Sequence, residues 1–304
     1  HYDRSWVQQF EQKLDELGVN YIDNTQLLQD RRAEGEQVFN KVYNAGHWND
    51  LGAFYGVNNI LESLSGFFPS IQPNELGDFA VTETLQETLL SSQFPIHEYE
   101  PTFGRLCELE VKTEEYDAEV ARNSQHRGFG YFVNPENVAA GAPKTLVFQG
   151  SYMNEMGFKF LQTGLGEYIY VHNYENLMDF DYYFNIFQPE CVVVEVAEYT
   201  VNSGYFNAER VENFSLNPVL TLDDAARQAD KQSLAPQIAE GERLSTLTVS
   251  LPEGTRYAYL LSEGRTFDLI EGEQGWQASV EKENLSADYT VVAVGADGEQ
   301  TRYQ

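Results

Sequence analysis

Hydrophobic and polar positions along the first two thirds of the chain switch repeatedly between helical and strand-like spacing. Apolar residues at helical intervals, or a polar helix-forming composition, predict helices over Trp6–Leu17, Thr25–Phe39, Ala53–Leu64, Met153–Leu165 and Leu177–Phe187. Short apolar runs predict strands over Val19–Asp23, Arg105–Val111, Lys144–Phe148, Tyr168–Val171 and Cys191–Val196. Strands that alternate with helices indicate a parallel sheet covered on both faces, so the pattern predicts a three-layer α/β domain.

The pattern changes near residue 215. Residues 222–243 are polar and helix-prone, which predicts a short connector. From residue 244 onward hydrophobic and polar residues alternate with a period of two, broken by turns that contain Gly or Pro. This spacing predicts a small antiparallel β module of Ig-like character. The predicted organisation is an α/β domain over 1–215, a connector over 216–243 and a β module over 244–304.

The charge balance restricts the partners of this protein. The 304 residues include 48 acidic and 19 basic side chains, for a formal net charge of −29, and 42% of the residues are hydrophobic. The hydrophobic content is sufficient for a folded core, which excludes wholesale disorder. A surface this acidic repels phosphate backbones, so we expect no nucleic-acid partner.

The two cysteines and the start of the sequence reveal little about function or location. Cys107 and Cys191 do not have metal-binding spacing, so we predict no metal site. The sequence allows a disulfide between the two cysteines. Cys191, however, is the first residue of an apolar run and fits a buried strand better. No apolar stretch approaches the ~20 residues that span a bilayer. The sequence starts at His1 rather than Met, which we interpret as a processed or trimmed chain, so a missing signal segment is no evidence for the cytoplasm.

Ser151 is a candidate nucleophile. It follows the predicted strand Lys144–Phe148 and precedes a predicted helix, and ligands of parallel α/β sheets bind at the carboxyl ends of the strands. Its backbone N–H would lie at a helix N-terminus, which suits an oxyanion. The alternative reading is a helix cap, the commonest role of a serine in this position.

His47 is the candidate base. A serine hydroxyl is a weak nucleophile unless an imidazole removes its proton. His47 lies in a polar turn before a predicted helix, next to Trp48 and Asn49. A histidine in such a turn also has an ordinary structural or exposed reading.

Five segments follow one another in a defined order within residues 6–200. They are Gly18–Asp23, Tyr43–Ala53, Gly77–Phe79, Leu146–Tyr152 and Pro189–Tyr199. Their content and order resemble the DHHW branch of the SGNH hydrolases, which includes the O-acetyltransferases of alginate and cell-wall polysaccharides, and in which the histidine motif precedes the serine motif. The resemblance implies an SGNH-hydrolase-like parallel sheet with no cofactor. It also implies a site with Ser151 as nucleophile, His47 as general base, and Ser151, Tyr152, Trp48, Asn49 and Gly150 around the oxyanion and substrate.

Several positions depart from the motifs of this branch. The triad aspartate, two residues before the histidine, falls on Ala45, the glycine and aspartate of the Gly-Asp-Ser motif fall on Gln149 and Gly150, and the arginine that ends the last motif falls on Tyr199. Loss of a triad aspartate lowers kcat by about 10⁴ in an enzyme where it was removed. Asp50 and Glu198 are the carboxylates that we consider as replacements.

The resemblance implies two functions of different classes. The first is an O-acetyltransferase or acetylesterase, in which Ser151 takes up an acetyl group and passes it to a polysaccharide hydroxyl or to water. A generic esterase would share this chemistry without needing a glycan acceptor. The second is a catalytically inactive protein that binds glycan or serves as a scaffold. In both cases we expect a secreted or membrane-anchored protein of the cell envelope. A polysaccharide acceptor and a membrane-bound O-acyltransferase are the implied partners.

Overall fold

The computed structural model describes residues 3–40, 47–87, 97–123, 127–200 and 205–304. These residues divide into two compact units. Unit 1 is formed by residues within 1–113, 124–175 and 190–206, and unit 2 by residues within 114–123, 176–189 and 207–304. The domain boundaries predicted at residues 215 and 243 remain predictions.

Most of the predicted helices are confirmed. The α-helices are α1 (Ser5–Glu16), α2 (Thr25–Ala33), α3 (Asp50–Ser65), α4 (Thr113–Tyr116), α5 (Pro135–Ala139), α6 (Phe158–Gly164), α7 (Phe180–Phe187) and α8 (Ala208–Asn213). A π-helical turn, η2 (Met153–Gly157), precedes α6, and the 3₁₀ turns are η1 (Leu76–Asp78), η3 (Tyr174–Asp179), η4 (Glu198–Thr200), η5 (Lys231–Leu234) and η6 (Lys282–Asn284). The predicted helix Thr25–Phe39 ends early, at Ala33, and the expected strand Val19–Asp23 is irregular backbone.

Unit 1 contains a five-stranded sheet and a separate hairpin. The sheet order is β3 (Glu110–Val111), β4 (Phe129–Val133), β6 (Glu167–His172), β5 (Lys144–Gln149) and β7 (Cys191–Val194), and the hairpin pairs β1 (Phe79–Gln86) with β2 (Glu98–Arg105). The predicted strands that became β5, β6 and β7 are confirmed, and Cys191 is buried and free. The predicted strand Arg105–Val111 is wrong, because Arg105 ends β2 and only Glu110–Val111 form a strand.

The predicted three-layer parallel sheet of the SGNH-hydrolase type is wrong. In the five-stranded sheet, β5 pairs in parallel with β6 and β7, whereas β4 pairs antiparallel with β6 and β3 antiparallel with β4. The larger sheet of the protein is mostly antiparallel and lies in unit 2. The physical reason is that hydrophobic periodicity predicts a strand but not the direction of its neighbour, and antiparallel edge strands commonly extend parallel sheets.

The core of unit 1 lies between α3, α6 and the central strands. Val57 and Leu61 of α3 and Phe160 of α6 are buried in one cluster with Val147 of β5 and Tyr168 of β6. Burial of each large apolar side chain stabilises the fold by about 1.5–3 kcal/mol. This packing holds the N-terminus of α3, which directly follows His47 and Trp48, near the end of β5.

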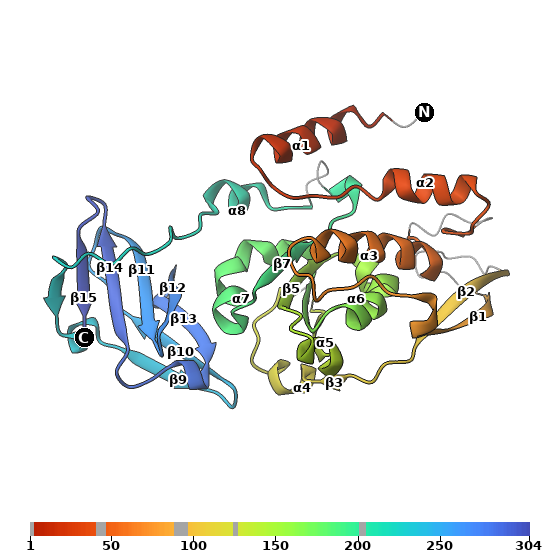
Figure 1. Ribbon diagram of the computed structural model, residues 1–304. Coiled ribbons are helices and arrows are strands. Elements are labelled where there is room, and N and C mark those ends of the chain that lie inside the picture. Colours follow the sequence, from red (N-terminus) through yellow and green to blue (C-terminus); the bar gives the residue numbers. More distant parts are fainter. Residues whose placement is uncertain (1–2, 41–46, 88–96, 124–126, 201–204) are drawn as a thin grey trace. The chain divides into compact units, whose positions relative to one another are not determined.

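Unit 2 contains one sheet of eight strands, of which Figure 1 labels β9 to β15. In sheet order they are β8 (Arg227–Ala229), β15 (Gln300–Tyr303), β14 (Thr290–Gly295), β11 (Thr255–Ser262), β12 (Arg265–Gly272), β13 (Gly275–Glu281), β10 (Leu244–Val249) and β9 (Gln237–Glu240). The antiparallel character predicted from residue 244 onward is confirmed. The predicted Ig-like arrangement of two packed sheets is not confirmed, because all eight strands are hydrogen-bonded to their neighbours in one continuous series.

The helical conformation expected within residues 222–243 is wrong, whereas their role as a connector remains a prediction. These residues form β8, the short turn η5 and β9, and β8 and β9 are the two edges of the sheet. All four residues of β9 are exposed. Polar edge strands lack the alternation that marks a half-buried strand, so the pattern did not reveal them. In the described ranges no helix has the length and apolar content needed to cross a bilayer.

Candidate active site

Ser151 lies at the first turn of a helix, directly beyond the carboxyl end of β5. The strand ends at Gln149, and the Asn154 N–H donates to the Gly150 carbonyl at 3.1 Å, which closes the first helical turn. Ser151 therefore occupies the strand-to-helix position that the sequence predicted for it.

His47 lies beside Ser151, although 104 positions separate them in the sequence. The distance between His47 Nε2 and Ser151 Oγ is 2.7 Å. In the tautomer that leaves Nε2 unprotonated, the ring accepts the hydroxyl proton of Ser151. This is the arrangement that a serine nucleophile and its base require.

Trp48 and Tyr152 join the two segments that carry these side chains. The Trp48 indole N–H donates to the Tyr152 carbonyl at 3.0 Å, and the two rings meet edge to face with centroids 5.4 Å apart. The Tyr152 ring also lies 4.9 Å from the His47 ring. Trp48 is buried and Tyr152 partly buried. The contacts support the position of His47 relative to Ser151.

Asn49 caps helix α3. Its side-chain oxygen accepts the Gly52 N–H at 3.0 Å, and its amide N–H donates to the Gln37 carbonyl at 2.6 Å. The side chain is buried and both of its polar ends are engaged. Its contacts therefore support the start of the helix behind His47, and its predicted part in substrate binding stays a prediction.

Gly52 packs too closely against its surroundings to accept a side chain. A Cβ there would lie 2.3 Å from the Val38 carbonyl oxygen and 2.9 Å from the Trp48 Cβ. We expect Gly52→Ala to lower the free energy of unfolding by about 1–3 kcal/mol, since overpacking forces the backbone to shift. Urea denaturation would measure it. Gly77→Ala is the control, because its Cβ would meet nothing within 4 Å. Equal urea midpoints for the two variants would contradict the expectation.

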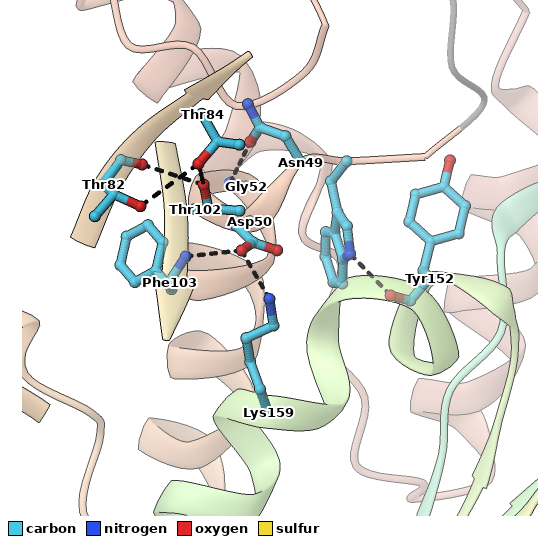
Figure 2. Close-up of polar contacts among 10 residues, drawn as sticks. Asn49, Asp50, Gly52, Thr82, Thr84, Thr102, Phe103, Tyr152 and Lys159 are labelled. Atoms are coloured by element: carbon cyan, nitrogen blue, oxygen red, sulfur yellow. Dashed lines mark hydrogen bonds and ion pairs between the residues drawn. The ribbon is translucent and has the colours of Figure 1, made fainter. Parts of the chain in front are cut away.

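Asp50 and Glu198, the carboxylates considered as replacements for the triad acid, are engaged elsewhere. Asp50 Oδ2 accepts the Phe103 N–H at 2.9 Å and pairs with Lys159 Nζ at 2.7 Å (Figure 2). Glu198 pairs with Arg4 at 2.9 Å. Ala45, the position of the missing triad aspartate, lies outside the described residues.

A partly buried carboxylate that the sequence analysis missed lies behind the serine turn. Glu195 Oε2 accepts the Gly150 N–H at 2.7 Å, and the Met153 N–H also acts on this carboxylate. Burial raises the pKa of Glu195 to about 7, and the two backbone N–H groups oppose that shift. Glu195 directly follows strand β7, at the same sheet edge as Ser151. The rule that places ligands at the carboxyl ends of parallel strands was a signal that pointed to it.

These contacts narrow the choice of oxyanion donors. The Gly150 N–H donates to Glu195, and the Met153 N–H is close enough to the same carboxylate to lower its pKa. Among the N–H groups of the first helical turn, those of Ser151 and Tyr152 remain as candidates. The predicted oxyanion role of Ser151 is compatible with this arrangement, whereas the Gly150 N–H is directed to a carboxylate.

Tyr199 is a second neighbour that the sequence analysis did not select. It stands where the DHHW-like motif ends in arginine, and its ring lies 5.6 Å from that of Tyr205. Burial and Tyr205 raise the pKa of Tyr199, while a side-chain hydrogen bond with Ser151 lowers it. The departure from the motif was the available signal. Within the described ranges no group of His, Cys, Asp and Glu side chains is arranged to hold a metal ion.

No family model matches this sequence, and no curated protein matches it either. Among solved structures, the chain is similar to a DHHW family protein from Eubacterium siraeum, at 13% identity and a TM-score of 0.44, over 66% of this chain and 71% of that chain. It is similar to PatB1 from Bacillus cereus at 14% identity and a TM-score of 0.39, over 56% of this chain and 66% of that chain. PatB1 with a sulfonyl adduct is similar at 15% identity and a TM-score of 0.39, over 60% and 67%. The matched region thus spans about two thirds of PatB1. Identities and TM-scores this low say nothing about the role of the site, which is inferred from the contacts of its own residues.

Proposed function

We propose that this protein transfers acyl groups through Ser151, as an O-acetyltransferase or acetylesterase that acts on polysaccharide. The observation that carries the proposal is the 2.7 Å distance between His47 Nε2 and Ser151 Oγ. A serine at a helix N-terminus, beyond the carboxyl end of a parallel strand and paired with an imidazole, suits covalent catalysis of acyl transfer.

The proposed reaction has two halves. In the first, Ser151 Oγ attacks the carbonyl carbon of an acyl ester, His47 Nε2 takes the hydroxyl proton, and the bond to the leaving alcohol breaks as His47 returns the proton to it. The Ser151 and Tyr152 N–H groups would stabilise the oxyanion. In the second half, a polysaccharide hydroxyl or water attacks the acyl-serine. His47 removes the proton of the attacking group, and Ser151 regains a proton when its ester bond breaks.

The substrate and location rest on the ordered motifs that resemble those of polysaccharide O-acetyltransferases. We infer a cell-envelope or secreted location, a polysaccharide acceptor and a membrane-bound O-acyltransferase that supplies the acyl group. The net charge of −29 supports the inference that nucleic acids are not partners.

Intact-mass spectrometry after incubation with p-nitrophenyl acetate tests the proposal. We expect an adduct of about 42 Da on the wild type and on Ser63→Ala, an exposed serine of α3, and no adduct on Ser151→Ala. Release of p-nitrophenol should depend on Ser151 in the same way. An adduct that persists in Ser151→Ala would overturn the assignment of the nucleophile.

A catalytically inactive glycan-binding or scaffold protein is the second candidate. It is favoured by the alanine at position 45 and by the engagement of Asp50 with Lys159 and of Glu198 with Arg4. The result that would select it is no adduct on the wild type together with activity in the double variant Ala45→Asp/Gly150→Asp.

A further inference from the structure

The carboxylate of Glu195 continues the pairing of two strands beyond the point where their backbone ladder ends. The last bridge of β5 with β7 joins Phe148 and Val194, and the Glu195 N–H donates to the Phe148 carbonyl at 2.8 Å. The next N–H on the β5 side, that of Gly150, donates to Glu195 Oε2 rather than to backbone. The chain leading into Ser151 is therefore held by a side chain.

The same carboxylate also reaches the residues after the nucleophile. The Met153 N–H, at the start of the π-helical turn, lowers the pKa of this carboxylate, so Glu195 interacts with the backbone on both sides of Ser151 and Tyr152. An ionised carboxylate has lone pairs for both N–H groups, whereas a protonated one carries an O–H directed into the same space. The backbone conformation of the serine turn therefore depends on whether Glu195 is ionised or protonated.

We propose that Glu195 is the positioning residue of the serine turn, and that its ionised form is required to hold Ser151 Oγ at His47. The inference rests on the proposed acyl-transfer function and adds a regulation of that site by pH. The residue does not touch the reacting atoms, so it acts through the placement of Ser151. Misplacement of a reacting group by about 1 Å costs on the order of 10²-fold in rate.

The direction of the pH dependence follows from the surroundings of this carboxylate. Burial raises its pKa to about 7, so the ionised form is lost as the pH falls through that value. The ionisable side chains with electrostatic effects around it are Tyr152 on the turn, Tyr168 on β6 and Tyr199 on η4, and the pKa of each is raised. These tyrosines stay neutral on the acid side of the profile, where Glu195 gains a proton.

The acid side of the rate profile tests the proposal. The initial rate of p-nitrophenyl acetate hydrolysis under kcat/KM conditions is measured from pH 5 to 9. In the wild type Glu195 must lose a proton, which is expected to add about one unit to the limiting slope of the logarithm of the rate below pH 7. In Glu195→Gln this added unit of slope is expected to be absent, and the rate at pH 8 to fall by about 10- to 100-fold.

The structure offers a matched control on the same two strands. At their other end, Glu190 Oε2 accepts the Lys144 N–H at 3.2 Å, which repeats the contact at the edge away from Ser151. Glu190→Gln is expected to retain the wild-type slope and rate. Glu195→Asp keeps a titratable carboxylate and is expected to retain the steeper slope at a reduced rate, which a purely structural defect would not produce.

The outcomes separate the two proposals. Wild-type turnover that does not depend on Ser151 overturns the proposed function. Turnover that depends on Ser151, with the same slope and a rate within twofold in Glu195→Gln, overturns only the role of Glu195. If Glu195→Gln fails to fold, Glu195→Asp decides, because loss of the steeper slope in that variant contradicts the proposal.

Discussion

Replacement of His47 with glutamine is expected to lower the rate of Ser151 acylation by about 10²- to 10⁴-fold, the usual contribution of a general base. Glutamine can still hydrogen-bond to the Ser151 hydroxyl, but it cannot take up its proton in the attack. The change therefore removes the proton transfer and preserves much of the local packing. Stopped-flow release of p-nitrophenol and the rate of adduct formation by mass spectrometry would both measure it.

His97→Gln is the control for this substitution. His97 is exposed and precedes β2, so the same chemical change there should leave acylation within about twofold of the wild type. Retention of the wild-type rate in His47→Gln would show that Ser151 reacts without the imidazole, and would remove the observation on which the proposed function rests.

Asp50→Ala is expected to reduce the free energy of unfolding by about 3–5 kcal/mol, the largest stability effect that we predict. The carboxylate is 3% exposed and holds both Lys159 Nζ and the Phe103 N–H. Its removal leaves a partly buried ammonium and a buried N–H without their acceptor. Asp50 also occupies the first turn of α3, where a negative charge favours the helix. Urea denaturation would measure the loss.

A double-mutant cycle with Lys159→Met isolates the ion pair. The two single changes should each be strongly destabilising, and the double change should cost less than their sum, because neither charge is then left alone. Asp30→Asn, an exposed carboxylate on α2, should change the free energy of unfolding by less than about 0.5 kcal/mol. A loss below 1 kcal/mol in Asp50→Ala would contradict a stabilising role.

The local pattern of hydrophobic residues was enough to predict the helices and strands that bury an apolar face. The helix predicted over Ala53–Leu64 matches α3, and the strand predicted over Lys144–Phe148 matches β5, because side chains such as Leu61 and Val147 are spaced by the period of their element. The antiparallel pairing of β4 with β6 was not predictable in this way. It depends on contacts between distant segments, which leave no periodicity in either one.

Some residues of the candidate site could likewise be predicted from the sequence, and others could not. The placement of Ser151 after a strand followed from pattern, but its partnership with His47 came from the order of motifs, since no local rule joins residues 104 positions apart. Glu195 was overlooked because it lay inside the predicted strand Cys191–Val196, where a single glutamate looks like a residue that faces solvent. Only the structure shows its contact with the Gly150 N–H.

Unit 2 is built from three separate stretches of chain, and this affects how the protein can fold during synthesis. Helix α7, with Tyr183, Ile186 and Phe187 buried, packs on β12 and β13, which are translated later. The Asn185 amide exchanges two hydrogen bonds with the backbone of Asp268 on β12, at 2.7 and 2.9 Å. A nascent chain that ends near residue 215 therefore carries an apolar helix whose binding surface does not yet exist. We expect such fragments to aggregate or to recruit chaperones until translation reaches the last strands.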